Sequence, residues 1–381
     1  MSNEFNLVNA FDELLLPKSD ARGYNTAGDV LTQTLDGRPL NALFTEFQQS
    51  LAFWNQKRQL IVDLLTFPVT NPIEDVPQGV TEDFEEASEF GVPKGISGFN
   101  YFSLGYDFKF YDLAVRYTWK FLLDATAAQV ENLNAMALEA DNRLVFQKVL
   151  RAVFNNVNRT TNIRGQNYTV YPFYNSDGTT PPTYKNNTFT NTHNHYITSG
   201  TAAIQSADLD EMEEHLVHHG YGKQNGGTLV LMVNRTEGNV IRQYRVATGA
   251  SYDFIPAQGA PAFLLPGMGI EGGRPASSFK GLDVIGSYGP WTIVQEDYIP
   301  AGYVLAFSTG GEGQASNPVG FREHANSSAR GLQLVKGAQP DYPLIDSYYR
   351  RGFGTGVRHR GAGIVMQVTV SGTYTIPTAY V

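Results

Sequence analysis

The strongest hydrophobic pattern in the chain is helical and covers residues 126–154. Apolar side chains recur there at steps of three and four residues, at Val130, Leu133, Ala137, Ala140 and Leu144. This spacing places them along one face of an α-helix. Thr126 and Gln129 have the spacing of a capping box at its start. The pattern predicts a helix roughly 40 Å long, at about 1.5 Å per residue.

Alternating apolar and polar positions predict a half-buried strand from Tyr111 to Phe121. Residues 43–67 begin with an amphipathic, helix-like pattern, and the apolar run at their end, residues 60–67, suits a second strand. The interval between these strands, residues 68–106, is broken by Pro and Gly and carries a cluster of acids. If the two strands pair, this interval is a long hairpin that projects from the body.

After the long helix the periodicity changes twice. Residues 155–205 are rich in Asn, Thr and Tyr and contain turn pairs, which predicts hairpins or an insertion. A mixed α/β pattern follows, with a helix at 207–219, a strand at 228–233 and, after an N-cap at Asn234, another helix to about Thr248. Further strands are expected at 282–286, 291–296, 303–308, 331–336 and 363–370.

These patterns predict an α+β fold in five parts. Residues 1–42 form an arm, residues 43–67 begin a body, and residues 68–106 form a projecting loop. Residues 107–205 complete the body with the long helix and the 155–205 insertion, and residues 206–381 form a mixed α/β region.

Composition narrows the class of protein. Hydrophobic residues make up 42% of the chain, which is typical of a globular protein. The formal net charge of -9 argues against a protein that grips phosphates tightly, because that attraction needs clustered Lys and Arg. The absence of cysteine excludes disulfides, cysteine nucleophiles and thiolate metal sites. The first residues do not have the pattern of a signal peptide, and no apolar run approaches the roughly 18 residues of a membrane span.

One glycine motif has the form of a dinucleotide-binding loop. Residues 267–272, GMGIEG, match G-x-G-x-x-G. That chemistry requires a helix to begin on the motif and present its backbone N–H groups to a pyrophosphate. Here Pro275 and a strand-like LDVI segment follow. We therefore expect a surface loop and no cofactor.

Five histidines are a candidate metal site. His215 and His219 are four residues apart on the expected helix and share its face with His218 close by, and His193 and His195 are possible further ligands. However, histidines at the end of a helix before Gly220 also complement the helix dipole. That simpler explanation accounts for the helical three, so we predict no metal.

Charged residues of the loop are candidates for contacts with another copy of the chain. The acids at 82–89 resemble a solvated face more than a catalytic set. Complementary charges across a subunit boundary fix register and partner choice. We therefore predict intersubunit contacts for the loop residues Glu82, Glu85, Glu86, Glu89 and Lys94, with Arg350, Arg351, Arg358 and Arg360 as candidate partners. No catalytic residue is expected.

The order of arm, projecting hairpin, long helix and mixed α/β region resembles the major capsid proteins of tailed phages. Their HK-ninety-seven-type fold is shared with encapsulins. Three stretches carry the likeness: EASEFGVPKG (86–95), LDVIGSYGPWTIVQEDYIPAGYVLAFS (282–308) and RRGFGTGVRHRGAGIVMQVTVSGTYTIPTAYV (350–381). By this resemblance the loop 68–106 is the extended loop, and the helix 126–154 is the spine of the peripheral domain. Residues 206–381 are the axial domain, whose final strand returns toward the peripheral domain. An actinobacterial phage is the expected source.

The resemblance implies a shell-building function without catalysis. Hexamers and pentamers of the chain would form an icosahedral head around double-stranded DNA, with only weak, non-specific proximity to that DNA. A portal, a separate scaffolding protein and a decoration protein are the implied further partners, and no membrane is involved. The implied location is the virion, after assembly in the host bacterial cytoplasm.

Two alternatives stay open. An encapsulin-type compartment would have the same fold but enclose protein cargo. A metal-dependent or carbohydrate-active enzyme would require the histidines to converge with acids.

Overall fold

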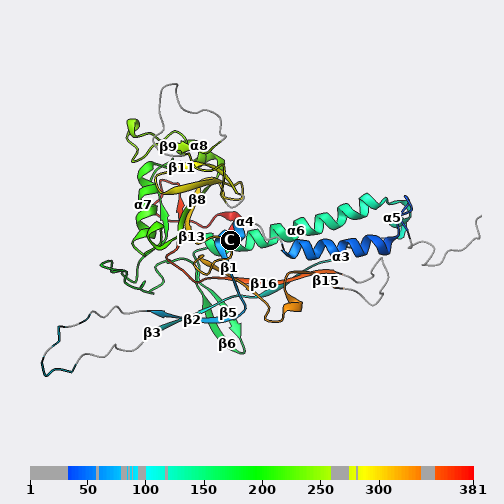
Figure 1. Cartoon of the computed structure of the whole chain (residues 1–381), viewed down its shortest axis with the longest axis horizontal. Helices are drawn as coiled ribbons and strands as arrows, with labels where there is room; N and C mark the ends of the chain where they lie inside the picture. The colour runs from blue at the N-terminus through cyan, green and yellow to red at the C-terminus, as the bar shows by residue number, and fades with distance from the viewer. Residues whose placement is uncertain are drawn as a thin grey trace, which may run out of the picture. The chain divides into compact units, whose positions relative to one another are not determined.

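The computed structural model describes residues 33–56, 60–78, 84, 86–87, 89–92, 100–115, 119–258, 274–279, 282–335 and 348–381. The chain forms two compact units, each built from separated segments. The first consists of Met1–Ala52, Leu113–Ala137 and Leu334–Tyr349, and the second of Phe53–Asp112, Leu138–Gln333 and Arg350–Val381. Figure 1 shows the elements along the chain. Among the described residues, no helix has both the length and the apolar character needed to cross a membrane.

The first unit has a helical core. Helix α3 (Leu40–Gln56) starts in it, α5 (Trp119–Asp124) lies wholly within it, and α6 (Ala127–Phe154) begins in it. One face of α3 buries Leu40, Leu43, Phe44 and Phe47 against Ala125, Ala127 and Val130. The spacing of the four α3 residues is that of a single helix face.

Helix α6 confirms the predicted long helix almost to the residue. The backbone N–H of Thr126 donates to the side-chain oxygen of Gln129 at 2.9 Å, which is the predicted capping contact. Asp36 accepts a further hydrogen bond from the backbone N–H of Ala127 at 3.0 Å. The first turn therefore has partners for N–H groups that the helix itself leaves unpaired.

The strand predicted over Tyr111–Phe121 is wrong in its second half. The strand β4 covers only Lys109–Leu113, and α5 begins at Trp119. Phe121 packs against the helical core of the first unit. Alternation over a few residues does not exclude a helix, and here helical packing decides the outcome.

The apolar run at 60–67 is mostly helix rather than strand, which is a second correction. Helix α4 covers Leu60–Leu65 and strand β1 covers only Thr66–Val69. Ile61, Val62, Leu64 and Leu65 are all buried in the main core of the second unit. A short, fully buried apolar run has no periodicity that separates the two structures.

An eight-stranded sheet organises the second unit. Its order is β10 (Ser278–Phe279), β11 (Leu282–Tyr288), β12 (Trp291–Gln295), β8 (Thr228–Val233), β13 (Tyr303–Thr309), β17 (Gly363–Gln367) and β7 (Tyr196–Thr198), with β9 (Phe254–Pro256) paired to β11. Strand β8 is buried at five of its six positions, as expected for a strand covered on both faces. The strands predicted at 228–233, 282–286, 291–296, 303–308 and 363–370 are confirmed, the last of them shorter than predicted.

Two helices of the second unit begin at or next to their predicted first residues. Helix α7 (Ser206–Val217) buries Leu209, Met212 and Leu216 against the sheet. Helix α8 (Arg235–Ile241) begins at the predicted N-cap, where the Asn234 side chain accepts a hydrogen bond from the backbone of Thr236. It ends seven residues before the predicted limit, and residues 246–248 form a separate 3-10 turn.

A second sheet joins strands far apart in sequence. Strand β1 pairs in parallel with β14 (Val319–Glu323), which pairs antiparallel with β16 (Tyr348–Val357). Strands β4 and β15 (Leu332–Val335) also pair with β16. The predicted pairing of residues 60–67 with 111–121 is therefore wrong, because β14 and β16 are the partners of β1 and β4.

Two hairpins leave this body. Strands β2 (Ile73–Gln78) and β3 (Asn100–Gly105) pair antiparallel, from Ile73 with Gly105 to Gln78 with Asn100, which confirms a hairpin within the predicted projecting loop. Strands β5 (Arg159–Ile163) and β6 (Gln166–Val170) form a second hairpin, as predicted for residues 155–205. Its two turn residues, Arg164 and Gly165, both have positive φ, the pattern of a tight two-residue turn.

Candidate subunit contacts and buried polar clusters

A partly buried polar contact ties the base of the β2–β3 hairpin to the rest of the second unit. Glu74 accepts a hydrogen bond from the Tyr106 hydroxyl at 2.6 Å and forms an ion pair with Arg358 at 2.9 Å. Burial raises the pKa of Tyr106, and the bond to Glu74 adds to this, so the phenol stays protonated and donates. Gly320 and Gly356 leave room for the Tyr106 ring, because a Cβ at either position would lie within 2.7 Å of it. The hairpin therefore leaves the body from a fixed position.

Three large apolar residues beyond β2 are almost fully exposed. The exposed fractions of Phe84, Phe90 and Val92 are 106%, 91% and 91%. Glu86 and Glu89, two of the predicted contact residues, are exposed between them. Glu82, Glu85 and Lys94 lie outside the described residues. Large apolar side chains left exposed on one loop are candidates for contact with a macromolecular partner.

The four arginines predicted as contact partners all have neighbours within their own chain. Arg358 pairs with Glu74, and Arg350 donates to the Gln333 side chain at 3.0 Å. Arg351 pairs with Asp141, whose carboxylate also accepts a bond from the Trp54 indole at 3.1 Å. Contacts of these arginines with the acids of a neighbouring copy stay a prediction.

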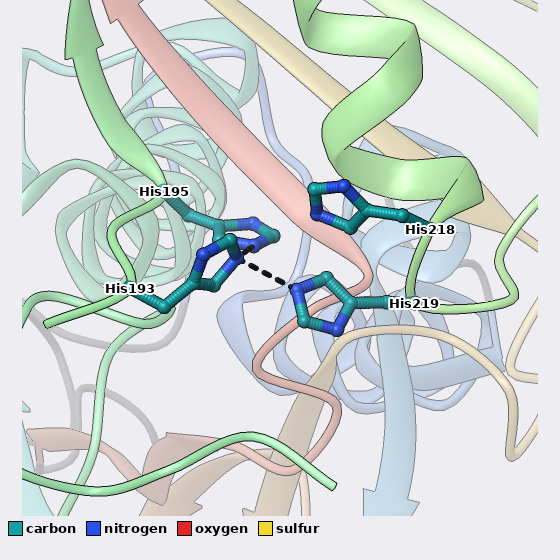
Figure 2. A group of neighbouring side chains, drawn as sticks. All are labelled: His193, His195, His218 and His219. Carbon is teal, nitrogen blue, oxygen red and sulfur yellow. Dashed lines mark hydrogen bonds between the residues drawn. The ribbon is translucent and has the colours of Figure 1, made fainter. Parts of the chain in front are cut away.

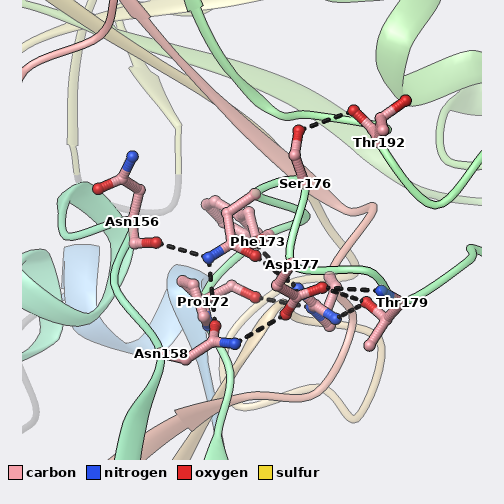
Figure 3. Close-up of polar contacts among 10 residues, drawn as sticks. Asn156, Asn158, Pro172, Phe173, Ser176, Asp177, Thr179 and Thr192 are labelled. Carbon is pink, nitrogen blue, oxygen red and sulfur yellow. Dashed lines mark hydrogen bonds and ion pairs between the residues drawn. The ribbon is translucent and has the colours of Figure 1, made fainter.

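Arg360 is the most enclosed of the four, with an exposed fraction of 4%. Its guanidinium donates to the Asp177 carboxylate at 2.9 Å, the Pro172 carbonyl at 3.0 Å and the Asn175 side chain at 3.1 Å. It also lies 4.6 Å from the centre of the Tyr174 ring. Figure 3 shows the loop that these contacts gather.

Asp177 completes this network from the opposite side. It accepts hydrogen bonds from the Asn158 side chain at 2.9 Å and from the Thr179 backbone at 3.1 Å. Burial by itself raises the pKa of Asp177, but these bonds and the Arg360 charge outweigh burial and hold the pKa below its usual value. Arg360 and Asp177 thus fix residues 172–179 against the turn between β16 and β17.

A histidine cluster lies next to this network, because the Tyr174 ring contacts both Arg360 and the His219 ring. Figure 2 shows four histidines of the cluster. His193 and His195 come from the segment that leads into β7, and His218 and His219 from the end of α7. Each can offer one ring nitrogen such that all four nitrogens lie within 4.8 Å of one another. His215, one turn earlier on α7, has its ring centre 5.7 Å from that of His193.

Aromatic rings and a glycine surround the cluster. His195 has an exposed fraction of 0% and its Nδ1 donates to the Gly363 carbonyl at 2.7 Å. The Phe189 ring stacks on His219 at 4.1 Å. Gly361 leaves room for this imidazole, because a Cβ there would lie 2.9 Å from it.

Burial makes these histidines neutral near pH 7. Desolvation, with further effects from neighbouring histidines, lowers the pKa of His193 and of His215 to about 4 and that of His219 to about 2. The pKa of His195 and of His218 is also lowered, again chiefly by burial. The interpretation of the α7 histidines as charges that complement the helix dipole is therefore wrong, because neutral rings supply no charge. Their spacing was visible in the sequence, but their convergence with His193 and His195 was not.

The comparisons with known proteins give one strong match. A chain from Mycobacterium phage Patience is 46% identical, over 96% of this chain and 98% of its own length, with a TM-score of 0.73. The capsid of the native GTA particle is 11% identical over 82% of this chain and 97% of its own, with a TM-score of 0.43. The holo-SrpI encapsulin from Synechococcus elongatus is 13% identical over 83% and 89%, with a TM-score of 0.42.

The assignment rests on the mycobacteriophage chain, since the other two similarities are weak. No protein-family model matches the sequence, and no curated protein does. Identity of 46% over nearly the whole of both chains leaves no segment that requires a different fold. The chain therefore belongs to the phage major capsid proteins of the α+β, HK-ninety-seven type.

Proposed function

We propose that this chain assembles with copies of itself, as hexamers and pentamers, into an icosahedral head that encloses double-stranded DNA. Its similarity to a phage chain over 96% of its length supports this proposal. The observation that carries the assembly step is the exposed apolar group Phe84, Phe90 and Val92 on a hairpin with a fixed base.

The hairpin contributes to assembly because its apolar side chains can be buried only in contact with a partner. Burying a fully exposed Phe or Val stabilises by about 1.5–3 kcal/mol, and in the single chain Phe84, Phe90 and Val92 gain none of this. A neighbouring subunit is the partner that covers them. Glu86 and Glu89 then lie at the rim of that contact, where complementary charges, including those of Arg350 and Arg358, select the register.

The further partners follow from the same proposal. The net charge of -9 suits an inner wall that does not hold the packaged DNA, because a basic surface would bind it tightly. A portal, a separate scaffolding protein and a decoration protein complete the particle, which assembles in the host cytoplasm and remains as the virion head. The chain acts in this as structure and not as an enzyme.

Electron microscopy of the expressed chain tests the proposal. We expect closed icosahedral shells, alone or with a co-expressed scaffolding protein. A chain that stays monomeric at high concentration under both conditions would refute it. Shells that enclose a specific protein instead of DNA would assign the encapsulin-type alternative.

A further inference from the structure

Neutral histidines cannot make both of the close nitrogen–nitrogen contacts in this cluster as separate hydrogen bonds. Nε2 of His193 lies 3.0 Å from Nε2 of His195 and 2.8 Å from Nε2 of His219. In neutral His195, Nδ1 must carry the proton because the Gly363 carbonyl only accepts, so His195 Nε2 is a lone pair.

Two arrangements of the remaining protons form a hydrogen bond without setting two N–H groups against each other, and neither satisfies both contacts. If His193 Nε2 carries a proton, that one proton is shared between the lone pairs of His195 and His219. If His219 Nε2 donates instead, the lone pairs of His193 and His195 face each other at 3.0 Å. A cation between the three nitrogens satisfies all of them at once, since every lone pair then has a partner.

Two further ring nitrogens are also left over. Among the described residues, Nε2 of His218 and Nδ1 of His215 are buried and have no hydrogen-bond partner. An unpaired buried polar atom costs about 1–3 kcal/mol, so such atoms are rare without a purpose. A bound ion facing His218 Nε2 accounts for that atom, whereas His215 lies outside the group of four histidines whose nitrogens converge.

The distances suit a tetrahedral metal. Nitrogens bound to Zn²⁺ at 2.0–2.1 Å lie about 3.3 Å apart in a tetrahedron. The observed separations run from 2.8 Å to at most 4.8 Å, on both sides of that value. The His195 contact to Gly363 is also the arrangement that orients metal-binding imidazoles, with the far ring nitrogen held by a carbonyl.

We propose that His193, His195, His218 and His219 bind one divalent transition-metal ion of the zinc class. Neutral imidazoles are good ligands for Zn²⁺, Ni²⁺, Co²⁺ and Cu²⁺ and poor ones for Mg²⁺ and Ca²⁺. The four ligands include no carboxylate and leave no open position on a tetrahedral ion, which makes the site structural and not hydrolytic.

The ion would cross-link two segments of the second unit. It links the residues before β7 to the end of α7, close to the Arg360 network. The chain has no cysteine, so a metal supplies the kind of cross-link that a disulfide supplies elsewhere. Because binding is a property of the single chain, it does not depend on the proposed assembly.

The test is metal binding by the untagged, full-length chain after treatment with a chelator. Zn²⁺ is added and measured by competition with a chromophoric chelator, and Co²⁺ is added as a spectroscopic probe of coordination geometry. We expect about one equivalent of either ion per chain, a tetrahedral Co²⁺ spectrum, and a rise in Tm with Zn²⁺ but not with Mg²⁺.

Variants locate the site. His193→Ala and His219→Ala should each weaken Zn²⁺ binding by more than about 100-fold, since loss of an outer-shell partner alone costs 10–100-fold. His324→Ala is the control, because His324 is exposed and outside the cluster. Circular dichroism reports whether each variant is folded.

Two results would overturn the proposal. One is a folded wild-type chain that takes up less than about a tenth of an equivalent of Zn²⁺ and Co²⁺. The other is binding that survives unchanged in folded His193→Ala and His219→Ala chains. Either result leaves the shell-building function untouched, whereas a failure to form particles leaves the metal measurement valid.

Discussion

The β2–β3 hairpin and the segment from Tyr171 to His195 both run outside the main sheets, yet they use their side chains in opposite ways. The hairpin exposes Phe84 and Phe90 almost completely, whereas the other segment buries Phe173 and gathers its polar groups around Arg360. The polar groups of the second segment have partners within the chain, whereas we propose that the exposed apolar residues of the hairpin gain theirs from a neighbouring copy. Sequence composition alone did not separate them, since both are rich in turns.

The largest loss of stability is expected when the ion pair between Arg360 and Asp177 is removed. Arg360→Ala leaves Asp177 buried without its counter-charge, and removing one partner of a buried ion pair costs about 3–5 kcal/mol. Urea unfolding of the unassembled chain measures this. Arg235→Ala, at an exposed position, is the control and should change the free energy of unfolding by less than about 0.5 kcal/mol. If Arg360→Ala and Arg235→Ala changed the free energy of unfolding equally, the Arg360 contacts would not be what stabilises the segment from Tyr171 to His195.

The anchor of the hairpin should have a smaller effect on stability. Glu74→Ala deprives the buried Tyr106 hydroxyl and Arg358 of a partner, and we expect a loss of about 1–3 kcal/mol in unfolding free energy. Assembly should also become less efficient, because the hairpin leaves the body from a less defined position. Normal yields of particles from Glu74→Ala would show that the anchor does not guide assembly.

A pH dependence follows from Asp177. Its pKa in the folded chain is below the unfolded value, so its contribution to stability is present above the unfolded pKa and is lost as the pH falls through the folded one. The difference in unfolding free energy between wild type and Asp177→Asn should be constant from pH 7 to about 5 and shrink below about pH 4. A difference that stays constant down to pH 2 would contradict the ionised state assigned to Asp177.

The smallest effect is expected for the exposed acids of the hairpin. Reversing Glu86 and Glu89 to Lys should leave stability within about 0.5 kcal/mol and slow assembly in a way that depends on salt, since rim charges act on association rates. Light scattering at low and high ionic strength measures this. Assembly rates equal to wild type at low salt would exclude these two acids from the contact.

The sequence predicted the elements with the strongest periodicity. Helix α6 and strands β8, β11, β12 and β13 are where the pattern placed them, because each buries a long face whose spacing is visible locally. Pairing was not predictable in the same way. Thr66 meets Val319 across a parallel ladder, and nothing near either residue in sequence records that contact.

The candidate sites also differ in whether their features are visible in the local sequence. The exposure of Glu86 and Glu89 followed from local composition, and the likeness to capsid proteins followed from the order of elements and three sequence stretches. The role of Arg360 did not, because its partners at 172–179 are brought to it by the tertiary fold. The convergence of His193 with His219 also depends on the end of α7 meeting the start of β7.

Assembly of a chain altered only at the exposed end of the hairpin tests the central claim most directly. Phe84→Ser combined with Phe90→Ser removes apolar surface that the single chain does not bury, and Val370→Ser is a matched change at another exposed position. Sedimentation should show no closed shells for the double variant and normal shells for Val370→Ser, with all three chains equally stable to urea. Shells of normal yield from the double variant would contradict the claim that a neighbouring subunit covers this surface.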